Sequence, residues 1–279
     1  MSYFVGSRSR ESKSIQTGNV AYTRYSIVHF SSKSNLIGNF IVWLLNSLHL
    51  GLGGSPKKLK SSKVARLFQG RLVMFTEPLK NEKEEAETGE NTKKIEKQEQ
   101  ELPFMFLNLD VPDMPLFQDD VQEKGILPQI AINDLLKKYD SETETNTTVG
   151  GVAVSRRYRL LETPAFLILN YDRFEKIIKK GKDANQEPEK KKVLATFPLS
   201  GLMIPVQDKQ GNEVKTEIYD LVANIVHVSG TRFLVHVPGP STEDKKGICW
   251  YEIDELGVKV MNVHDILLSE TSLQIWKRR

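Results

Sequence analysis

The sequence predicts an α+β fold organised around a mostly antiparallel sheet. Most apolar segments are short, rich in β-branched and aromatic residues, and bounded by polar or glycine-containing turns, as strands are. Few segments show the i, i+3, i+4 spacing of an amphipathic helix, and no internal repeat is visible. With 279 residues, the chain can bury a core in one large domain or two small ones.

The N-terminal part contains one predicted helix. Residues 1–34 are polar with scattered aromatic residues, so we expect a divergent, poorly ordered segment without a secretory signal. Over residues 35–50 the apolar residues recur at helical spacing, and glycines end the pattern. This stretch is too short to cross a bilayer and contains Asn39 and His49. It therefore predicts a buried helix rather than a membrane span.

A strand region and a charged insertion follow. Val64–Thr76 is rich in β-branched and aromatic residues and predicts one or two strands. Residues 77–101 consist mainly of Lys, Glu, Asn, Thr and Gln, which bury too little apolar surface to offset the entropy lost on ordering. We therefore expect a disordered charged insertion over 77–101, with a solvated helix from Thr92 to Glu101 as the alternative.

The middle of the chain alternates predicted strands with polar loops. A short amphipathic helix is expected over residues 132–139. Polar side chains predict a loop at Asp140–Gly151, and lysines predict a basic loop at 176–192. The strand nearest the basic loop is apolar on both faces and is expected inside the sheet. The predicted strands are Phe104–Val111, Tyr158–Leu161 and Ala165–Leu169.

The C-terminal third is mostly β. Tyr219–His227 predicts a buried strand, and the turn at Ser229–Gly230 leads to a hairpin partner over Thr231–Val237. A short helix is expected near Val263–Leu268. The remaining strands are expected at Trp250–Asp254, Val258–Met261 and Leu273–Lys277.

Composition excludes several kinds of site. Cys249 is the only cysteine, which excludes an intrachain disulfide, a CxxC redox centre and a cysteine-rich zinc site, and fits a reducing compartment. No phosphate-binding loop, HExxH or GxSxG pattern is present, and we expect no cofactor and no metal. The net charge of +3, and lysine runs without interleaved aromatic residues, favour solvated loops over a nucleic-acid interface.

Seven segments occur in the order that is typical of ubiquitin-specific proteases. Among them, FQG begins the fingers in that family, the YDL strand precedes the catalytic histidine, and a WY strand carries the third triad residue. From residue 35 to 279 the chain therefore resembles a partial ubiquitin-specific-protease domain of papain-like fold, with palm and fingers sheets and a thumb truncated to about one helix. The segments are 68–76, 104–116, 127–140, 157–174, 219–230, 249–255 and 273–279.

Three phrases are similar to the spliceosomal, tri-snRNP-associated branch of this family: FIVWLLNSLH, YDLVANIVH and QIWKRR. That branch is regarded as catalytically dead, and its usual amino-terminal zinc finger is not found in this sequence. The resemblance implies a non-catalytic nuclear scaffold that binds snRNP proteins, supports the tri-snRNP and pre-mRNA splicing, and contacts no DNA and no membrane. The alternatives are a fragment of an active cysteine-type deubiquitinase and a ubiquitin-binding module, with weak ubiquitin binding at best.

The resemblance places altered residues at the catalytic positions. An active member needs a thiolate nucleophile, an imidazole that accepts its proton, and a residue that orients the imidazole. Arg232 stands where the histidine is expected, and a permanent cation cannot act as a general base. Asp254 stands at the third position. His236 lies ~13 Å further along the strand, and His227 belongs to the preceding strand, where we expect a structural role.

No cysteine occupies the nucleophile position. Gly18–Tyr22 is similar to the nucleophile box with Ala21 in place of cysteine, but too few residues separate it from the 35–50 helix to form a thumb, so we treat the likeness as chance. Cys249 belongs to the WY strand and is expected to be a packed or edge thiol. The finger stretches Met74–Glu77 and Ser141–Arg157 lack the cysteine pairs that hold zinc in active relatives.

Overall fold

The computed structural model describes residues 36–55, 58–79, 97–113, 127–149, 152–174, 190–229, 232–241 and 248–279. Three expected features lie wholly or largely outside the described residues: the N-terminal segment 1–34 with its Gly18–Tyr22 likeness, most of the charged insertion, and most of the basic loop. The turn at Ser229–Gly230 is described only at Ser229.

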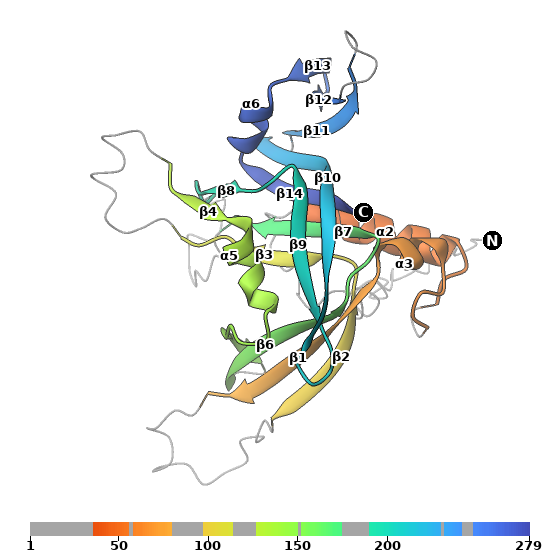
Figure 1. Ribbon diagram of the computed structural model, residues 1–279, viewed down its shortest axis with the longest axis vertical. Helices are drawn as coiled ribbons and strands as arrows, with labels where there is room; N and C mark the ends of the chain where they lie inside the picture. Colours follow the sequence, from red (N-terminus) through yellow and green to blue (C-terminus); the bar gives the residue numbers. More distant parts are fainter. Residues whose placement is uncertain are drawn as a thin grey trace, which may run out of the picture.

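An eight-stranded palm sheet forms the centre of the molecule (Figure 1). Its order is β13-β12-β11-β10-β14-β7-β3, with β9 paired to β10, and every pairing is antiparallel except that of β3 with β7. The strands predicted in the C-terminal third are confirmed, and β7 lies inside the sheet as expected. The bounds are β3 Leu107–Asp110, β7 Phe166–Asp172, β9 Ser200–Gln207, β10 Glu213–Ser229, β11 Arg232–Pro240, β12 Ile248–Asp254, β13 Gly257–Met261 and β14 Thr271–Arg278.

A four-stranded antiparallel fingers sheet projects from one end of the palm sheet (Figure 1). Its strands, in spatial order, are β2 Gln98–Phe104, β1 Gly70–Pro78, β6 Val152–Glu162 and β5 Thr145–Val149. A small parallel pair is formed by β4 Gln129–Ala131 and β8 Leu194–Thr196.

Apart from the 16-residue α2, the helices are short, and they lie on both sides of the palm sheet (Figure 1). The predicted helices at 35–50, 132–139 and Val263–Leu268 are confirmed. Within the described part of the chain, no helix is long and apolar enough to cross a membrane. The bounds are α2 Leu36–Gly51, α3 Lys63–Phe68, α5 Ile132–Leu136, the 3₁₀ helix η1 Lys137–Tyr139, and α6 Val263–Leu267.

The strand prediction for Val64–Thr76 is wrong in its first half, because α3 occupies Lys63–Phe68. The Ser62 side chain accepts a hydrogen bond from the backbone N–H of Ala65 at 3.1 Å, which caps the helix. Val64 and Ala65 are buried under α2, so tertiary packing outweighs the strand preference of a β-branched segment.

The expected disorder over 77–101 is wrong at both ends. β1 continues to Pro78, and β2 begins at Gln98, which also excludes the alternative helix over 98–101. The first residues of β2 are exposed and polar because this edge strand pairs only with β1. Ion pairs hold it there, including Lys97 to Glu77 at 2.8 Å and Arg71 to Glu101 at 2.8 Å.

Two further strands were not expected, and one expected strand is bent. The expected loop Asp140–Gly151 contains β5, another polar edge strand that pairs with β6. The expected strand Phe104–Val111 bends at residues 105–106, where the chain leaves the fingers sheet for the palm sheet and buries both side chains beneath α2. β9 was not predicted from the sequence.

A single apolar core joins the two large sheets. It includes Leu72 and Leu160 from the fingers sheet and Leu202, Tyr219 and Trp276 from the palm sheet. A second, smaller cluster lies where α2 packs on the opposite face of the palm sheet, and its members include Val42, Leu45, Ile168, Ile225 and Leu273. The palm sheet is therefore apolar on both faces near its centre.

Arg173 is completely buried at the end of β7. Its guanidinium donates hydrogen bonds to the carbonyl of Thr271 and to the carbonyls of Val193, at 2.5 Å, and Lys191, at 3.4 Å. Phe174 and Lys190 form an antiparallel bridge beside it. The Arg173 guanidinium thus ties the end of β7 and residues 191–193 to the start of β14.

Candidate functional site

The two predicted triad positions meet at one end of the palm sheet. Arg232 begins β11, and Asp254 ends β12. The guanidinium Nη2 of Arg232 lies 3.4 Å from Oδ2 of Asp254. The Arg232 side chain is half exposed and the Asp254 side chain is largely covered. The structure thus places an ion pair where the resemblance expects an imidazole and its orienting carboxylate.

The Asp254 carboxylate is also engaged by the turn that follows it. Its Oδ1 accepts hydrogen bonds from the backbone N–H groups of Leu256, at 2.8 Å, and Gly257, at 3.1 Å. These two bonds and the Arg232 guanidinium lower the pKa of Asp254. The carboxylate therefore stays ionised near neutral pH, and its contacts close a hairpin and neutralise a cation.

His236 lies inside the palm sheet, where its side chain is 1% exposed. An amide nitrogen can only donate, so Nδ2 of Asn224 donates to Nδ1 of His236 at 3.2 Å. The ring proton then resides on Nε2, which donates to Oε2 of Glu252 at 3.4 Å. Burial lowers the pKa of His236. The neutral ring satisfies both neighbours.

This histidine is one member of a polar row that crosses five strands. Gln274, Asn224, His236, Glu252 and Lys259 are direct cross-strand neighbours on β14, β10, β11, β12 and β13. The row ends in an ion pair of 2.6 Å between Nζ of Lys259 and Oε1 of Glu252. Sequence reasoning missed this row, although Asn224 within an otherwise apolar strand was a local signal of a buried polar contact.

His227 on β10 and Cys249 on β12 are the two other side chains that the sequence singled out. The His227 ring packs between the rings of Phe174 and Phe233, with centroid distances of 5.6 and 5.0 Å. Cys249 is partly exposed on β12 opposite Gly239. It stands five residues before Asp254 on the same strand, roughly 17 Å away at the rise of an extended chain. The thiol and the Arg232–Asp254 pair therefore do not form one site.

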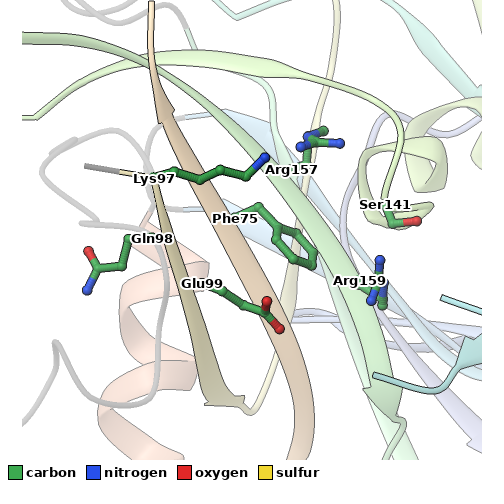
Figure 2. A pocket seen from close by; sticks show the side chains of 7 residues that line it. All are labelled: Phe75, Lys97, Gln98, Glu99, Ser141, Arg157 and Arg159. Carbon is green, nitrogen blue, oxygen red and sulfur yellow. The ribbon is translucent and has the colours of Figure 1, made fainter. Parts of the chain in front are cut away.

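The fingers sheet carries a separate shallow cavity of ≈ 360 Å³. Figure 2 shows the Phe75 ring between residues 97–99 of the β2 side and the two arginines of β6. Arg157 and Arg159 lie 5.8 and 4.9 Å from the ring centroid, within cation–π range. Arg157 and Lys97 share the carboxylate of Glu77. This cavity combines cations with an aromatic surface.

Metal binding finds no support among the side chains that can be placed. In the described ranges, no three His, Cys, Asp or Glu side chains come together as ligands would. The absence of metal remains a prediction from the sequence.

The comparisons with known proteins agree on one family. A family model described as ubiquitin carboxyl-terminal hydrolase matches residues 14–275. The crystal structure of an essential yeast splicing factor is similar with a TM-score of 0.52 at 22% identity, over 86% of this chain and 48% of that one. These matches confirm the predicted α+β fold of a ubiquitin-specific protease, with mainly antiparallel sheets and few helices.

Two curated relatives are similar over most of this chain. Ubiquitin carboxyl-terminal hydrolase 39 of Homo sapiens is 33% identical over 251 residues, which are 86% of this chain and 42% of the human protein. The probable mRNA-splicing protein ubp10 of Schizosaccharomyces pombe is 32% identical over 252 residues, which are 86% of this chain and 47% of that protein. The chain spans less than half the length of these relatives.

The splicing names among the matches confirm the resemblance to the spliceosomal branch. The palm and fingers sheets and a family match over residues 14–275 converge on one assignment. This chain belongs to the ubiquitin carboxyl-terminal hydrolase family.

Proposed function

We propose that this chain is a non-catalytic ubiquitin-specific-protease-like scaffold of the spliceosome. It binds snRNP proteins in the nucleus and supports the assembly or stability of the tri-snRNP, and through it pre-mRNA splicing. The observation that carries the non-catalytic part is the Arg232–Asp254 ion pair at the triad positions.

The chemistry of isopeptide hydrolysis supports this reading. The reaction needs a base that accepts the thiol proton and returns it to the leaving amine. Arg232 is a cation rather than a base, and Asp254 pairs with it at 3.4 Å. Cys249, the only thiol in the sequence, lies on the far part of β12 beside Trp250. The only thiol of the sequence is therefore distant from the ion pair, and the residue at the expected base position is a cation.

The splicing part rests on the relatives. A fission-yeast protein at 32% identity is named as a probable mRNA-splicing protein, and a structure of the same fold is titled as an essential yeast splicing factor. A chain that retains the palm and fingers sheets without catalysis fits a protein that binds partners through its surface rather than hydrolysing a substrate in its cleft.

Ubiquitin with a thiol-reactive carboxyl terminus tests the non-catalytic part. We expect no covalent adduct with the full chain under conditions in which an active family member is labelled completely. The Cys249→Ser variant serves as the matched control, because it removes the only thiol. An adduct that forms with the native chain and disappears in this variant would contradict the proposal and favour a deubiquitinase.

Affinity purification from nuclear extract tests the splicing part. We expect snRNP proteins to co-purify with the tagged full chain, and their consistent absence would contradict the scaffold role. Recovery of ubiquitin alone, with a measurable affinity in an NMR titration, would instead favour a ubiquitin-binding module.

A further inference from the structure

The outer edge of the palm sheet is formed by β13. Among the described residues, this five-residue strand is the last in the sheet and pairs only with β12. Asp254 pairs with Gly257 across a two-residue loop, which closes on a hydrogen-bonded pair. Such pairs alternate along an antiparallel ladder, so Val258 and Val260 direct their backbone N–H and C=O groups away from β12.

This edge has only some of the features that usually limit strand pairing. Exposed edges are normally protected by short strand length, charges (especially Lys), prolines or bulges, and β13 is short and carries Lys259. β13 has no proline, and its register with β12 is unbroken. Val258 and Val260 are 65% and 61% exposed. Lys259 is the only charged residue of the strand, and its ammonium is held by Glu252. Within the described ranges, no strand pairs with the outer side of β13, and its two valines and single lysine leave room for an added strand.

The rows of side chains that cross the sheet define which strand would fit. One apolar row runs through Ile225, Val235, Ile253 and Val258, and exposure rises toward the edge, from 8% at Ile225 to 39% at Ile253 and 65% at Val258. A second row runs through Val237, Tyr251 and Val260. The polar row ends between them at Lys259. Directly opposed side chains stabilise a sheet when apolar faces apolar and cation faces anion.

A second copy of this chain fits this edge poorly. Antiparallel pairing of two β13 strands about their centre would place Lys259 opposite Lys259, and like charges in that position are destabilising. A foreign strand with an acidic residue there would instead share the ammonium with Glu252. Charge complementarity thus selects a partner of different sequence.

We propose that β13 is a docking edge for an extended segment of a partner protein, which joins the palm sheet as an additional strand. The segment carries an acidic residue opposite Lys259 and apolar, preferably β-branched, residues opposite Val258 and Val260. This inference rests on the proposed scaffold function and names its contact surface. Main-chain hydrogen bonds provide the affinity, and the three side-chain rows provide the specificity.

A designed peptide tests the edge in the full chain. The probe is the blocked peptide Ser-Thr-Val-Glu-Val-Thr-Ser, and the readout is amide hydrogen exchange at Val258 and Val260 measured by NMR. We expect the peptide to slow exchange at both amides. The same peptide with lysine in place of glutamate should bind about three- to tenfold more weakly, because it opposes Lys259 with a like charge. Equal binding of both peptides, or unchanged exchange, would overturn the inference.

Variants test the same edge independently. The Val258→Lys/Val260→Lys chain should lose the peptide effect, whereas Val214→Lys should keep it, because Val214 is equally exposed at 63% but lies on β10. Loss in both chains would overturn the proposal. Sedimentation must show a monomer, since a dimer that the double variant abolishes would assign the edge to a second copy.

Co-purification separates this inference from the proposed function. If snRNP proteins accompany the native chain and the double variant equally, the scaffold role stands and the docking edge is wrong. If they accompany neither, the scaffold role is wrong, and the peptide experiment alone decides the edge. If only the native chain and Val214→Lys retain them, both are supported.

Discussion

At the scale of single residues, Arg232 carries the proposal that this chain is non-catalytic. The resemblance places it where active relatives have an imidazole, and Oδ2 of Asp254 lies 3.4 Å from its guanidinium. The resemblance predicted both residues, and the structure brings them together. The ion pair itself could not be predicted, because it depends on a hairpin turn that orients Asp254 and on pairing between β11 and β12.

Replacement of Arg232 by histidine tests whether a base alone restores activity. We expect Arg232→His to hydrolyse a fluorogenic ubiquitin conjugate no faster than Arg232→Ala, because no thiol stands within reach of the new imidazole. Both variants should fold, since the native side chain is half exposed. Hydrolysis by the histidine variant that Cys249→Ser removes would show that the thiol reaches this position.

His236 makes folding stability sensitive to acid. Its pKa is lowered in the folded chain from an ordinary value of 6.5, so below about pH 6.5 the unfolded chain binds a proton that the folded chain does not. The groups that face it are Asn224, Glu252 and, through Glu252, Lys259. A proton on Nδ1 would oppose the Asn224 amide, which also donates.

We therefore expect the free energy of unfolding to fall between pH 7.5 and 5.5, and to fall less in His236→Gln. Urea titrations at both pH values measure the difference. Comparison of the two chains cancels the contribution of carboxylates such as Asp220, whose pKa is held at about 2 by Arg279. The stabilisation that such a carboxylate provides is lost only at a lower pH than this range. An equal pH dependence in both chains would assign the effect elsewhere.

At the scale of elements, α2 has one buried and one exposed apolar face. Val42 and Leu45 pack into the second cluster, whereas Phe40, Trp43 and Leu48 are each about half exposed. The sequence predicted the helix but expected it to be buried, whereas one apolar face is exposed. We expect Leu45→Ala to cost about 2 to 4 kcal/mol of unfolding free energy, and the matched Leu48→Ala about 1 kcal/mol or less. Urea unfolding measures both, and equal costs would contradict the assignment of faces.

The local sequence pattern predicted those elements well in which buried and exposed residues alternate along the chain. It failed for elements whose structure depends on contacts with neighbouring strands. The hairpins of the C-terminal third were predicted because their strands are rich in apolar residues and are separated by polar turns. β2 was read as disorder because an edge strand held by ion pairs needs few apolar residues. β9 was missed although Leu202, Ile204 and Val206 alternate, since a proline such as Pro205 argues against a central strand. The structure accepts Pro205 because, among the described residues, β9 pairs only with β10. The polar row as a whole could not be predicted from the sequence, because its members become neighbours only through the register of five paired strands.

At the scale of the whole molecule, one core makes the two large sheets dependent on each other. Leu72, Tyr158 and Leu160 of the fingers sheet share it with Tyr219 and Trp276 of the palm sheet. A cut between the sheets would therefore expose apolar surface on both sides. The fingers are part of the folding unit rather than an appendage.

We expect a single unfolding transition in which both sheets participate. In a Trp43→Phe background, fluorescence reports the buried Trp250 and Trp276 of the palm sheet, and far-UV circular dichroism reports all strands. The two probes should give coincident urea curves, and Leu160→Ala in the fingers should shift both midpoints equally. A shift of the dichroism curve alone would mean that the fingers unfold separately.

The buried Arg173 and the Phe174–Lys190 bridge hold together two parts of the chain that are separated by residues 175–189. Bridged residues of an antiparallel pair lie about 5 Å apart. Because the closure entropy of a loop grows only logarithmically with its length, a change in the number of residues between the two anchors would alter the entropy of closure only slightly. The two anchors, rather than the chain length between them, therefore fix this junction beside the palm sheet.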